Sequence, residues 1–399
     1  MAELSVGKLI LAINPGSSSV KFGIFRPGDS GAAELYRGSI ESIGSNPKFT
    51  VRSRVDSEVG SGNSGDFHTD SLATREAAYE LILQFLKAKS LSEQIGRVCY
   101  RVVHGGSYFS APVRIDASVL DKLESLIPLA PLHQPIGIEA IRLFTEHFSR
   151  SQHIACFDTA FHRTMPKIAQ MFALPGWLHE QGIRSYGFHG LSYQYSVERV
   201  ASLNEGVTPR RIVIAHLGSG ASMCALLDGK SAATSMTFSP LDGLPMATRC
   251  GSLDANAVLY MIDHLELSTK KVSDILNKES GLLGLSGLSG DVRILIASDS
   301  EDARIALDFY IDRICRELGA MTGILQGLDA LVFTGGVGAN NPVIRERVCE
   351  RLEWLGVSLR PVESDRREEN ISSPSSQIAV YAIEADEEHV MAELAAETG

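Results

Sequence analysis

The sequence predicts an α/β protein with two domains that each open on a strand, a turn and a second strand. Short apolar runs of strand length alternate along the chain with longer stretches of helical periodicity, as in layered α/β folds. A shift of 202 residues, from Gly16 to Gly218, is about half of the 399-residue chain. It aligns Gly-Ser at 16–17 with Gly-Ser at 218–219, each after an apolar run. A short match can arise by chance, but a half-length shift is where a duplication would place it.

The opening hairpin is the first of these units. Apolar runs at 9–13 and 22–25 flank residues 14–21, which read Asn-Pro-Gly-Ser-Ser-Ser-Val-Lys. Hydroxyls, an amide, backbone N–H groups and an ammonium gather in this tight turn, and a phosphate needs such donors. The same residue types also dominate ordinary polar turns, so this segment by itself leaves both interpretations open.

Two further glycine-rich segments follow apolar runs. Residues 212–215 lead into His-Leu-Gly-Ser-Gly-Ala-Ser at 216–222, and residues 330–333 lead into Thr-Gly-Gly-Val-Gly-Ala-Asn at 334–340. Three glycine-rich turns at strand ends predict a cleft that is lined by backbone N–H groups and fits a nucleotide.

The remaining elements follow from periodicity and from turn-forming residues. Strand-like segments continue to about residue 55, and a surface loop rich in Gly, Ser and Asp is expected at 57–70. Apolar pairs at helical spacing predict an amphipathic helix over 74–88. Strands are expected at 97–103 and 154–157, and helices at 253–265, 384–397 and 302–325, the last of these apolar enough to lie in the interior.

Composition and charge exclude several classes of protein. The length suits two domains, and 44% hydrophobic with 21% charged residues is typical of a globular chain. The net charge of −11 argues against nucleic acid or an anionic membrane as the main partner. No leader and no apolar run of membrane-spanning length occur, so a cytoplasmic location is expected. The six cysteines are scattered, which predicts reduced thiols rather than a zinc or redox site.

Polar side chains stand where several predicted strands end, and sites in α/β sheets gather at such ends. Singly, each has an ordinary structural explanation, such as a helix cap, a hydrogen-bonded core histidine or a surface cation. Their glycine neighbours and the phosphate-type hairpin make them a coherent set. The set is Asn14, Arg101, His133, Asp158, His189, His216 and Arg249.

Longer motifs carry a resemblance to one enzyme family. The most specific is Phe-Asp-Thr-Ala-Phe-His-Arg-Thr-Met-Pro at 157–166. The others are the hairpin motif at 14–21, Arg-Val-Val-His-Gly-Gly at 101–106, Ala-Pro-Leu-His at 130–133, Tyr-Gly-Phe-His-Gly at 186–190, the glycine motif at 216–222, Met-Ala-Thr-Arg at 246–249, Ser-Gly at 280–281 and Asp-Glu-Glu at 386–388. They cover nearly the whole chain in order, and the sequence is identified as a member of the acetate kinase family.

The resemblance implies a fold. The family has two duplicated α/β domains of the actin-like ATPase (ribonuclease H-like) type, with a nucleotide cleft between them. Carried onto this chain, the N-terminal domain comprises 1–158 with 385–399 and holds the phosphate hairpin and the C-terminal helix. The second domain, 159–384, holds the nucleotide cleft and the surface of an expected homodimer.

The reaction implied by the resemblance is reversible phosphoryl transfer from ATP to acetate, giving ADP and acetyl phosphate, with magnesium or manganese. A carboxylic acid with a pKa of about 4 to 5 is already ionised at neutral pH and needs no general base. The difficulty is electrostatic, because two anions must meet in line. Within the family, the alternatives are a propionate or butyrate kinase and a relative with another phosphoryl donor, such as pyrophosphate.

The resemblance also assigns roles to individual residues. Arg101 would hold the substrate carboxylate, while Arg249 and His189 would stabilise the phosphoryl group in transfer. His133 would help to position that group, and Asp158 would orient metal and substrate. A nucleotide-binding protein without activity is the alternative from another class. The loss of Arg101, Asp158, His189 or Arg249 would mark it, and all four are present.

Metal, nucleotide and acyl sites are implied in the same way. Asn14 and Glu387 would bind magnesium, directly or through water, since oxygen ligands suit that ion. The residues near the phosphates and the nucleotide would be Ser17, Ser19, Lys21, His216, Leu217, Gly218, Ser219, Gly220, Asp291, Val292, Arg293, Gly336, Val337, Gly338, Ala339 and Asn340. An apolar pocket for the methyl end of the substrate would be formed by Val103, Leu132, Phe188 and Pro240. Val103 favours acetate, because relatives that prefer propionate tend to carry a smaller residue there.

Four departures from the family's motifs occur. Ser219 stands where Asn is usual, and Ala339 stands where Glu is usual. Cys-Gly-Ser-Leu-Asp at 250–254 replaces Ser-Gly-Asp-Ile-Asp, and Asp386 replaces the Asn of Asn-Glu-Glu. The residues assigned to phosphoryl transfer are intact, whereas the nucleotide side is altered. The expected chemistry is therefore retained, and the preferred phosphoryl donor stays open.

Overall fold

A computed structural model describes residues 8–16, 18–29, 31–54, 72–361 and 368–398. The loop expected at 57–70 lies outside the described residues. Contacts along the chain divide it into two compact units. Unit 1 comprises residues 1–160 and 386–399, and unit 2 comprises residues 161–385, within two residues of the expected division.

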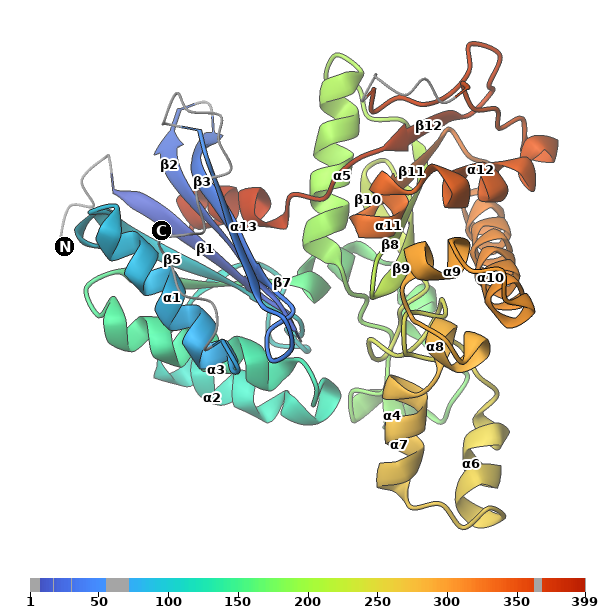
Figure 1. The fold of residues 1–399 in the computed structure, drawn as a ribbon, viewed down its shortest axis with the longest axis horizontal. Coiled ribbons are helices and arrows are strands. Elements are labelled where there is room, and N and C mark those ends of the chain that lie inside the picture. The colour runs from blue at the N-terminus through green and yellow to red at the C-terminus, as the bar shows by residue number, and fades with distance from the viewer. Residues whose placement is uncertain (1–7, 17, 30, 55–71, 362–367, 399) are drawn as a thin grey trace. The chain divides into compact units, whose positions relative to one another are not determined.

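Unit 1 is built on a seven-stranded sheet with the strand order β4-β3-β2-β1-β5-β7-β6. Figure 1 labels β1, β2, β3, β5 and β7 of this sheet. β1 pairs antiparallel with β2 and parallel with β5, which pairs parallel with β7. Every residue of β1 except the last positions near the turn is apolar, as expected for a central strand that is covered on both faces. The strands are β1 (Leu9–Pro15), β2 (Val20–Gly28), β3 (Gly31–Glu41), β4 (Lys48–Ser53), β5 (Ile95–Val102), β6 (Val113–Arg114) and β7 (Gln152–Phe157).

Helices cover both faces of this sheet (Figure 1). On one face, alternate residues of β1 pack in an apolar cluster with α1 (Arg75–Ala88), α2 (Ala117–Ser125) and α3 (Gln134–His147). The predicted helix at 74–88 is confirmed, and Thr74 caps it by accepting a hydrogen bond from the backbone N–H of Ala77. On the other face, α13 (Glu387–Glu397) packs against β1, β2 and β5, so the end of the chain completes unit 1.

Unit 2 repeats the central part of this sheet in the order β10-β9-β8-β11-β12. β8 pairs antiparallel with β9 and parallel with β11, just as β1 pairs with β2 and β5. The strands are β8 (Arg211–Leu217), β9 (Ala221–Leu227), β10 (Lys230–Thr234), β11 (Ala330–Thr334) and β12 (Ala379–Ala382). The shared topology agrees with the duplication expected from the half-length shift.

The helices of unit 2 are α4 (Gly176–Glu180), α5 (Gly190–Leu203), α6 (Ala255–Asp263), α7 (Thr269–Lys278), α8 (Gly281–Ser286), α9 (Val292–Ile296), α10 (Glu301–Leu325), α11 (Gly335–Asn340) and α12 (Pro342–Glu350). α5 packs on the sheet through Tyr193 and Val200, and α10 packs against β8, β9 and β10. The helix expected to lie in the interior is α10, and it does so with one face. Only one face of this amphipathic helix is buried, and Ile305 and Ile324 are about half exposed.

The third glycine-rich segment is a short helix rather than the turn expected at 334–340. α11 begins at Gly335, which has a φ of +75° that side-chain-bearing residues rarely adopt. A Cβ atom there would lie 2.7 Å from the carbonyl oxygen of Leu217. The glycine therefore lets the start of α11 approach the end of β8.

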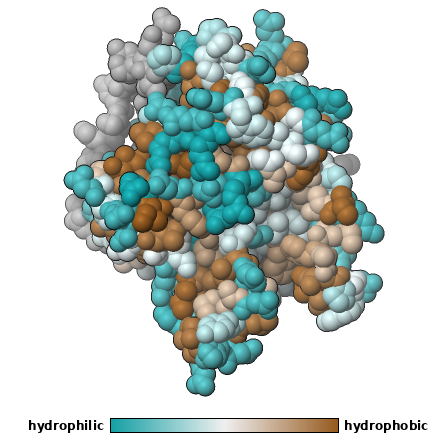
Figure 2. Space-filling view, turned by 90° about the vertical axis from the view of Figure 1, so that its right-hand side faces the viewer, coloured by the Kyte–Doolittle hydropathy of each residue, from teal (hydrophilic) through white to brown (hydrophobic). Residues whose placement is uncertain are grey.

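Several large apolar residues of unit 2 remain at the surface. They include Leu259 and Tyr260 on α6, Leu285 on α8 and Ile294 on α9. α6 and α7 lie at the lower end of Figure 1, and the lower part of Figure 2 shows hydrophobic side chains among hydrophilic ones. Within the described part of the chain, every helix is too short or too polar to cross a bilayer. All six cysteines are free thiols.

Candidate active site

A cluster of charged groups lies in unit 1 where β1, β5 and β7 end. Asn14 stands near the end of β1, Arg101 near the end of β5, and Asp158 directly after β7. Neighbouring parallel strands bring their carboxyl ends to one edge of a sheet. The fully buried carboxylate of Asp158 accepts hydrogen bonds from Arg101 Nη2 at 2.7 Å and from Arg101 Nε at 3.1 Å. This two-point ion pair fixes the guanidinium plane.

The acidic start of α13 joins this cluster. Asn14 Nδ2 donates to Glu387 Oε2 at 2.8 Å and to Glu388 Oε1 at 2.6 Å. Asn14 Oδ1 accepts from Arg101 Nη1 at 3.3 Å, and the same Nη1 lies 3.4 Å from Glu387 Oε2. Burial raises the pKa of Glu388, and the positive charge of Lys21 opposes that shift. Residues 373 positions apart in sequence thus share one buried polar network.

Asp386 anchors the start of α13 to the sheet. One oxygen accepts a hydrogen bond from the backbone N–H of His389 at 3.0 Å and caps the helix. The other pairs with Arg37 of β3, which also pairs with Glu34. Asparagine, which is usual here, could cap the helix but could not form the ion pair. The departure at this position therefore adds an electrostatic contact.

The other residues of unit 1 that were predicted for the site lie on several different segments. Ser19 closes the hairpin turn, because its carbonyl accepts from Gly16 N–H at 2.7 Å, whereas Ser17 lies outside the described residues. Lys21 is exposed within β2 and pairs in register with Asn14. A P-loop lysine would open a helix instead. Of the remaining residues, His133 precedes α3, Val103 follows β5, and Leu132 is half exposed.

A second cluster forms in unit 2 around the turn of the β8–β9 hairpin. The turn is closed by a 2.9 Å hydrogen bond from Gly218 N–H to the carbonyl of Gly220. The His189 ring stacks on the His216 ring, with centroids 4.2 Å apart and planes at 13°. A Cβ atom at Gly220 would lie 2.9 Å from Arg249 Nη2 and 3.5 Å from His189 Nε2. Glycine therefore lets the guanidinium and the imidazole meet over the turn.

Arg249 is held differently from Arg101. Its Nη1 donates to the carbonyl oxygen of Pro240, and burial lowers its pKa to about 10. Within the ranges that the structure describes, no carboxylate forms an ion pair with Arg249. A buried cation without a paired carboxylate favours the binding of an anion.

The predicted nucleotide segments are neighbours in unit 2. Gly335 lies against the backbone of Leu217, and a Cβ atom at Gly218 would lie 3.8 Å from the backbone nitrogen of Gly336. The start of α11 is therefore next to the glycine turn. Its later residues, Val337, Gly338, Ala339 and Asn340, complete the helix, and Arg345 donates to the carbonyls of residues 338 and 339.

Ala247 lies between the segment at 290–293 and the glycine turn and contacts both. Ser219 O accepts from the backbone N–H of Ala247 at 3.2 Å, and a Cβ atom at Gly290 would lie 2.6 Å from Ala247 O. Asp291 caps α9 and pairs with Arg293, whose side chain is largely exposed, whereas Val292 is buried. The residues predicted for the acyl pocket come from both units. Val103 and Leu132 belong to unit 1, while Phe188 and Pro240 belong to unit 2.

His162 supports this site and was not predicted as a functional residue. Burial lowers its pKa to about 4, so the ring is neutral at pH 7. Its Nε2 donates to the carbonyl oxygen of Phe188 at 2.9 Å, and its Nδ1 therefore accepts from Ser231 Oγ at 2.9 Å. Gly187, with a φ of +84°, leaves room for this ring. His162 thus fixes the segment that carries His189. It stands in the motif at 157–166, but no sequence spacing links it to residue 189.

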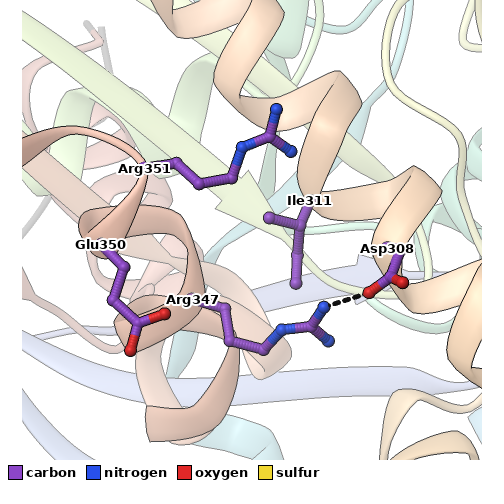
Figure 3. A pocket seen from close by; sticks show the side chains of 5 residues that line it. All are labelled: Asp308, Ile311, Arg347, Glu350 and Arg351. Atoms are coloured by element: carbon purple, nitrogen blue, oxygen red, sulfur yellow. Dashed lines mark hydrogen bonds and ion pairs between the residues drawn. The ribbon is translucent and has the colours of Figure 1, made fainter.

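A hollow elsewhere in unit 2 is separate from this cluster. It lies between α10 and α12 and contains none of the predicted site residues (Figure 3). Its lining residues are Asp308, Ile311, Arg347, Glu350 and Arg351. Arg347 pairs with Asp308 and Arg351 pairs with Asp312, so both arginines are already engaged across the two helices.

Comparisons with known proteins identify the family of this chain. The model of the Acetokinase family matches residues 9–393. The acetate kinase of Methylocella silvestris is 43% identical over 393 residues, which are 97% of each chain. Among solved structures, a propionate kinase of Francisella tularensis has a TM-score of 0.84 at 35% identity, covering 98% of this chain and 100% of its own. The acetate kinase of Porphyromonas gingivalis has a TM-score of 0.80 at 32% identity, covering 97% and 98%. The chain therefore belongs to the acetokinase family and is a phosphotransferase that acts on a carboxyl group.

Proposed function

We propose that this phosphotransferase is an acetate kinase, which transfers the γ-phosphoryl group of ATP reversibly to acetate and forms ADP and acetyl phosphate. The observation that carries the proposal is the pair of polar clusters at corresponding strand ends of the two units. One has a guanidinium surrounded by carboxylate and amide groups, and the other has a guanidinium and two imidazoles over a glycine turn. The relatives at about 40% identity are named acetate kinase.

Arg101 would bind the substrate carboxylate. Its guanidinium is held in plane by Asp158, and its Nη1 faces Asn14 and Glu387. A guanidinium presents paired N–H donors that match the two oxygens of a carboxylate. Asp158 would act by orienting that guanidinium, because acetate is already ionised and needs no general base.

Arg249 and His189 would stabilise the transferring phosphoryl group. Phosphoryl transfer depends on positioning and on stabilisation of the negative charge that spreads over the equatorial oxygens. Nη2 of Arg249 and Nε2 of His189 meet over Gly220, which leaves no side chain between them. Backbone N–H groups of the turn and of the start of α11 would contact the nucleotide phosphates. His133 would assist from unit 1.

Asn14 and Glu387 would hold magnesium. A carboxylate and an amide oxygen fit an ion that keeps several waters and binds substrate phosphates rather than an all-protein cage. Among the described residues, no three His, Cys, Asp or Glu side chains are grouped as such a cage. When bound, the ion would neutralise negative charge on the phosphates.

A panel of acceptors and donors tests the proposal. The purified protein would be assayed with acetate, propionate and butyrate, each with ATP or pyrophosphate, and with and without magnesium. We expect the highest kcat/KM with acetate and ATP, and no activity after removal of the metal. A preference for propionate is the second candidate, which the similarity to the propionate kinase of Francisella tularensis favours. A preference for butyrate or propionate would overturn the interpretation of Val103. A preference for pyrophosphate over ATP would overturn the assignment of the nucleotide site.

A homodimer that forms through unit 2 is also part of the proposal. The exposed apolar residues of α6, α8 and α9 would supply a surface whose burial favours association. Sedimentation should give twice the mass of the 43.1 kDa chain. Charged substitutions at Leu259 and Tyr260 should shift the protein toward a monomer, and an unchanged mass would count against this face. The cytoplasmic location stays a prediction.

A further inference from the structure

The hydrogen bonds behind His189 select one of its two neutral tautomers. His189 Nδ1 lies 2.7 Å from Ser222 Oγ, while its Nε2 faces the position where Gly220 lacks a side chain. Ser222 is fully buried, and its hydroxyl also contacts the hydroxyl of Tyr193 on α5. The serine hydroxyl has one proton, so it can donate to only one of these two partners.

The direction of the two hydrogen bonds that link Tyr193, Ser222 and His189 follows from the strength of the donors. A phenolic hydroxyl is the more acidic of the two hydroxyls, so Tyr193 donates to Ser222 Oγ. The serine proton is then available to His189 Nδ1, which accepts it in the arrangement proposed below. A neutral imidazole that accepts on Nδ1 carries its own proton on Nε2. The Nε2–H of His189 consequently points toward the glycine turn.

His216 shows the same arrangement. Its Nδ1 lies 2.8 Å from Ser192 Oγ, and a Cβ atom at Gly218 would lie 3.9 Å from its Nε2. The face-to-face stack of the His216 and His189 rings also disfavours two imidazolium ions, which would repel each other at a centroid distance of 4.2 Å. Both rings thus direct the same nitrogen to the same turn.

We propose that Ser222, supported by Tyr193, is a positioning residue that holds His189 as the tautomer protonated on Nε2, ready to donate to a phosphoryl oxygen. A neutral donor beside Arg249 would stabilise negative charge without placing a second buried cation next to the guanidinium. The identity of the acceptor as a phosphoryl oxygen rests on the proposed function. The tautomer itself does not.

Nitrogen chemical shifts of the imidazole test the tautomer directly. The full-length protein, labelled with ¹⁵N in histidine, would be measured at a pH about 2 units above the ordinary imidazole pKa. The signals of residue 189 are assigned by their loss in His189→Gln. We expect a protonated Nε2 and an unprotonated Nδ1 in the wild type, and a mixture of tautomers in Ser222→Ala. A wild-type ring protonated on Nδ1, or unchanged signals in Ser222→Ala, would overturn the proposal.

Kinetics supply the second measurement. In Ser222→Ala we expect kcat to fall about 10- to 100-fold, the loss typical of a misplaced catalytic group. The KM for acetate should hardly change, because Arg101 belongs to unit 1. Tyr193→Phe, which keeps the ring packing, should lower kcat less. Wild-type kcat in Ser222→Ala would contradict the positioning role.

Ser196→Ala is the matched control. Ser196 is equally buried on α5 and donates to the carbonyl of Ser192, but its hydroxyl contacts neither ring. Its kcat and its tautomers should match those of the wild type. If the wild-type protein phosphorylates no carboxylate, the proposed function fails, and the nitrogen shifts still decide whether Ser222 sets the tautomer.

Discussion

The two units share a strand arrangement but hold charge in opposite ways. In unit 1, the strand ends bring Arg101 together with Asp158 and Glu387, so the cation is compensated by carboxylates. In unit 2, His189 directly precedes α5 and Arg249 lies in the segment between β10 and α6, and both reach the glycine turn of the β8–β9 hairpin, where no described carboxylate pairs with Arg249. The two units share a sheet topology, and the side chains of each cluster determine the sign of the charge on the group that the cluster can bind.

The largest effect should come from removing the uncompensated cation of unit 2. Arg249→Ala should lower kcat by about 100- to 1,000-fold, as expected for loss of a donor to a developing oxyanion. Acetyl phosphate trapped as the hydroxamate measures the rate. Arg304→Ala, which removes an exposed arginine of α10, is the control and should leave the rate unchanged. Formation of acetyl phosphate at the wild-type rate by Arg249→Ala would show that this cation is not needed.

Removing a carboxylate from unit 1 should instead affect stability as well as activity. Asp158→Asn leaves the partly buried guanidinium of Arg101 without its main partner, and such changes cost up to about 3–5 kcal/mol. Urea unfolding followed by circular dichroism should therefore show an early transition, which we assign to unit 1. Glu124→Gln breaks the exposed pair with Arg142 and should cost less than about 1 kcal/mol. Equal stability of the two variants would argue against a buried, coupled cluster.

Acid should weaken both units, because each contains at least one histidine whose pKa is lowered by burial. Burial lowers the pKa of His104 in unit 1 and of His162 in unit 2 from 6.5 to about 4. Between these values the unfolded chain binds protons that the folded chain does not, so stability falls as the pH drops below 6.5. Each group should remove about 1.4 kcal/mol per pH unit.

Urea midpoints at several pH values between 7 and 5 measure this slope. His162→Gln should reduce the pH dependence, although it also destabilises the protein at neutral pH. His147→Gln, at an exposed position on α3, should leave the slope as it is. A wild-type slope in His162→Gln would mean that the histidine is not buried in its neutral form.

The smallest expected effect concerns the departure at the glycine turn. Ser219→Asn restores an amide near the proposed phosphate position, and one neutral hydrogen bond contributes about 0.5–1.5 kcal/mol. We therefore expect the KM for ATP to fall about 2- to 10-fold, while the KM for acetate stays constant. Steady-state kinetics at saturating acetate measure the change. A shift in the KM for acetate alone would place Ser219 away from the nucleotide.

Patterns within short segments correctly predicted the elements whose conformation depends mainly on residues close in sequence. The hairpin around residues 14–21 and the helix from Arg75 to Ala88 follow from apolar periodicity and turn residues. The segment 335–340 was predicted as a turn because glycine-rich segments usually are turns. Its helical form depends on a close approach to Leu217 that only the folded sheet provides.

Contacts between distant segments could not be predicted. Arg37 and Asp386 pair across 349 residues, and neither belongs to a pattern that indicates the other. Ser222 is recognisable only once β9 is known to turn its hydroxyl toward α5, where it meets Tyr193. In unit 1, the ends of the predicted strands indicated which polar side chains lie close together. The residues that orient the site side chains by hydrogen bonds could be identified only from the folded structure.

The return of α13 to unit 1 determines the order in which a newly made chain can complete its parts. Residues 161–385 are all synthesised before Glu387 and Glu388, so unit 2 can fold on the ribosome while unit 1 still lacks one helix. The buried network around Asn14 forms only after release of the last residues. A chain that ends prematurely near residue 385 would keep the glycine turn of unit 2 and lose Glu387 and Glu388 from the network of unit 1. The polar network of unit 1 can thus be completed only after every segment of unit 2 has been synthesised.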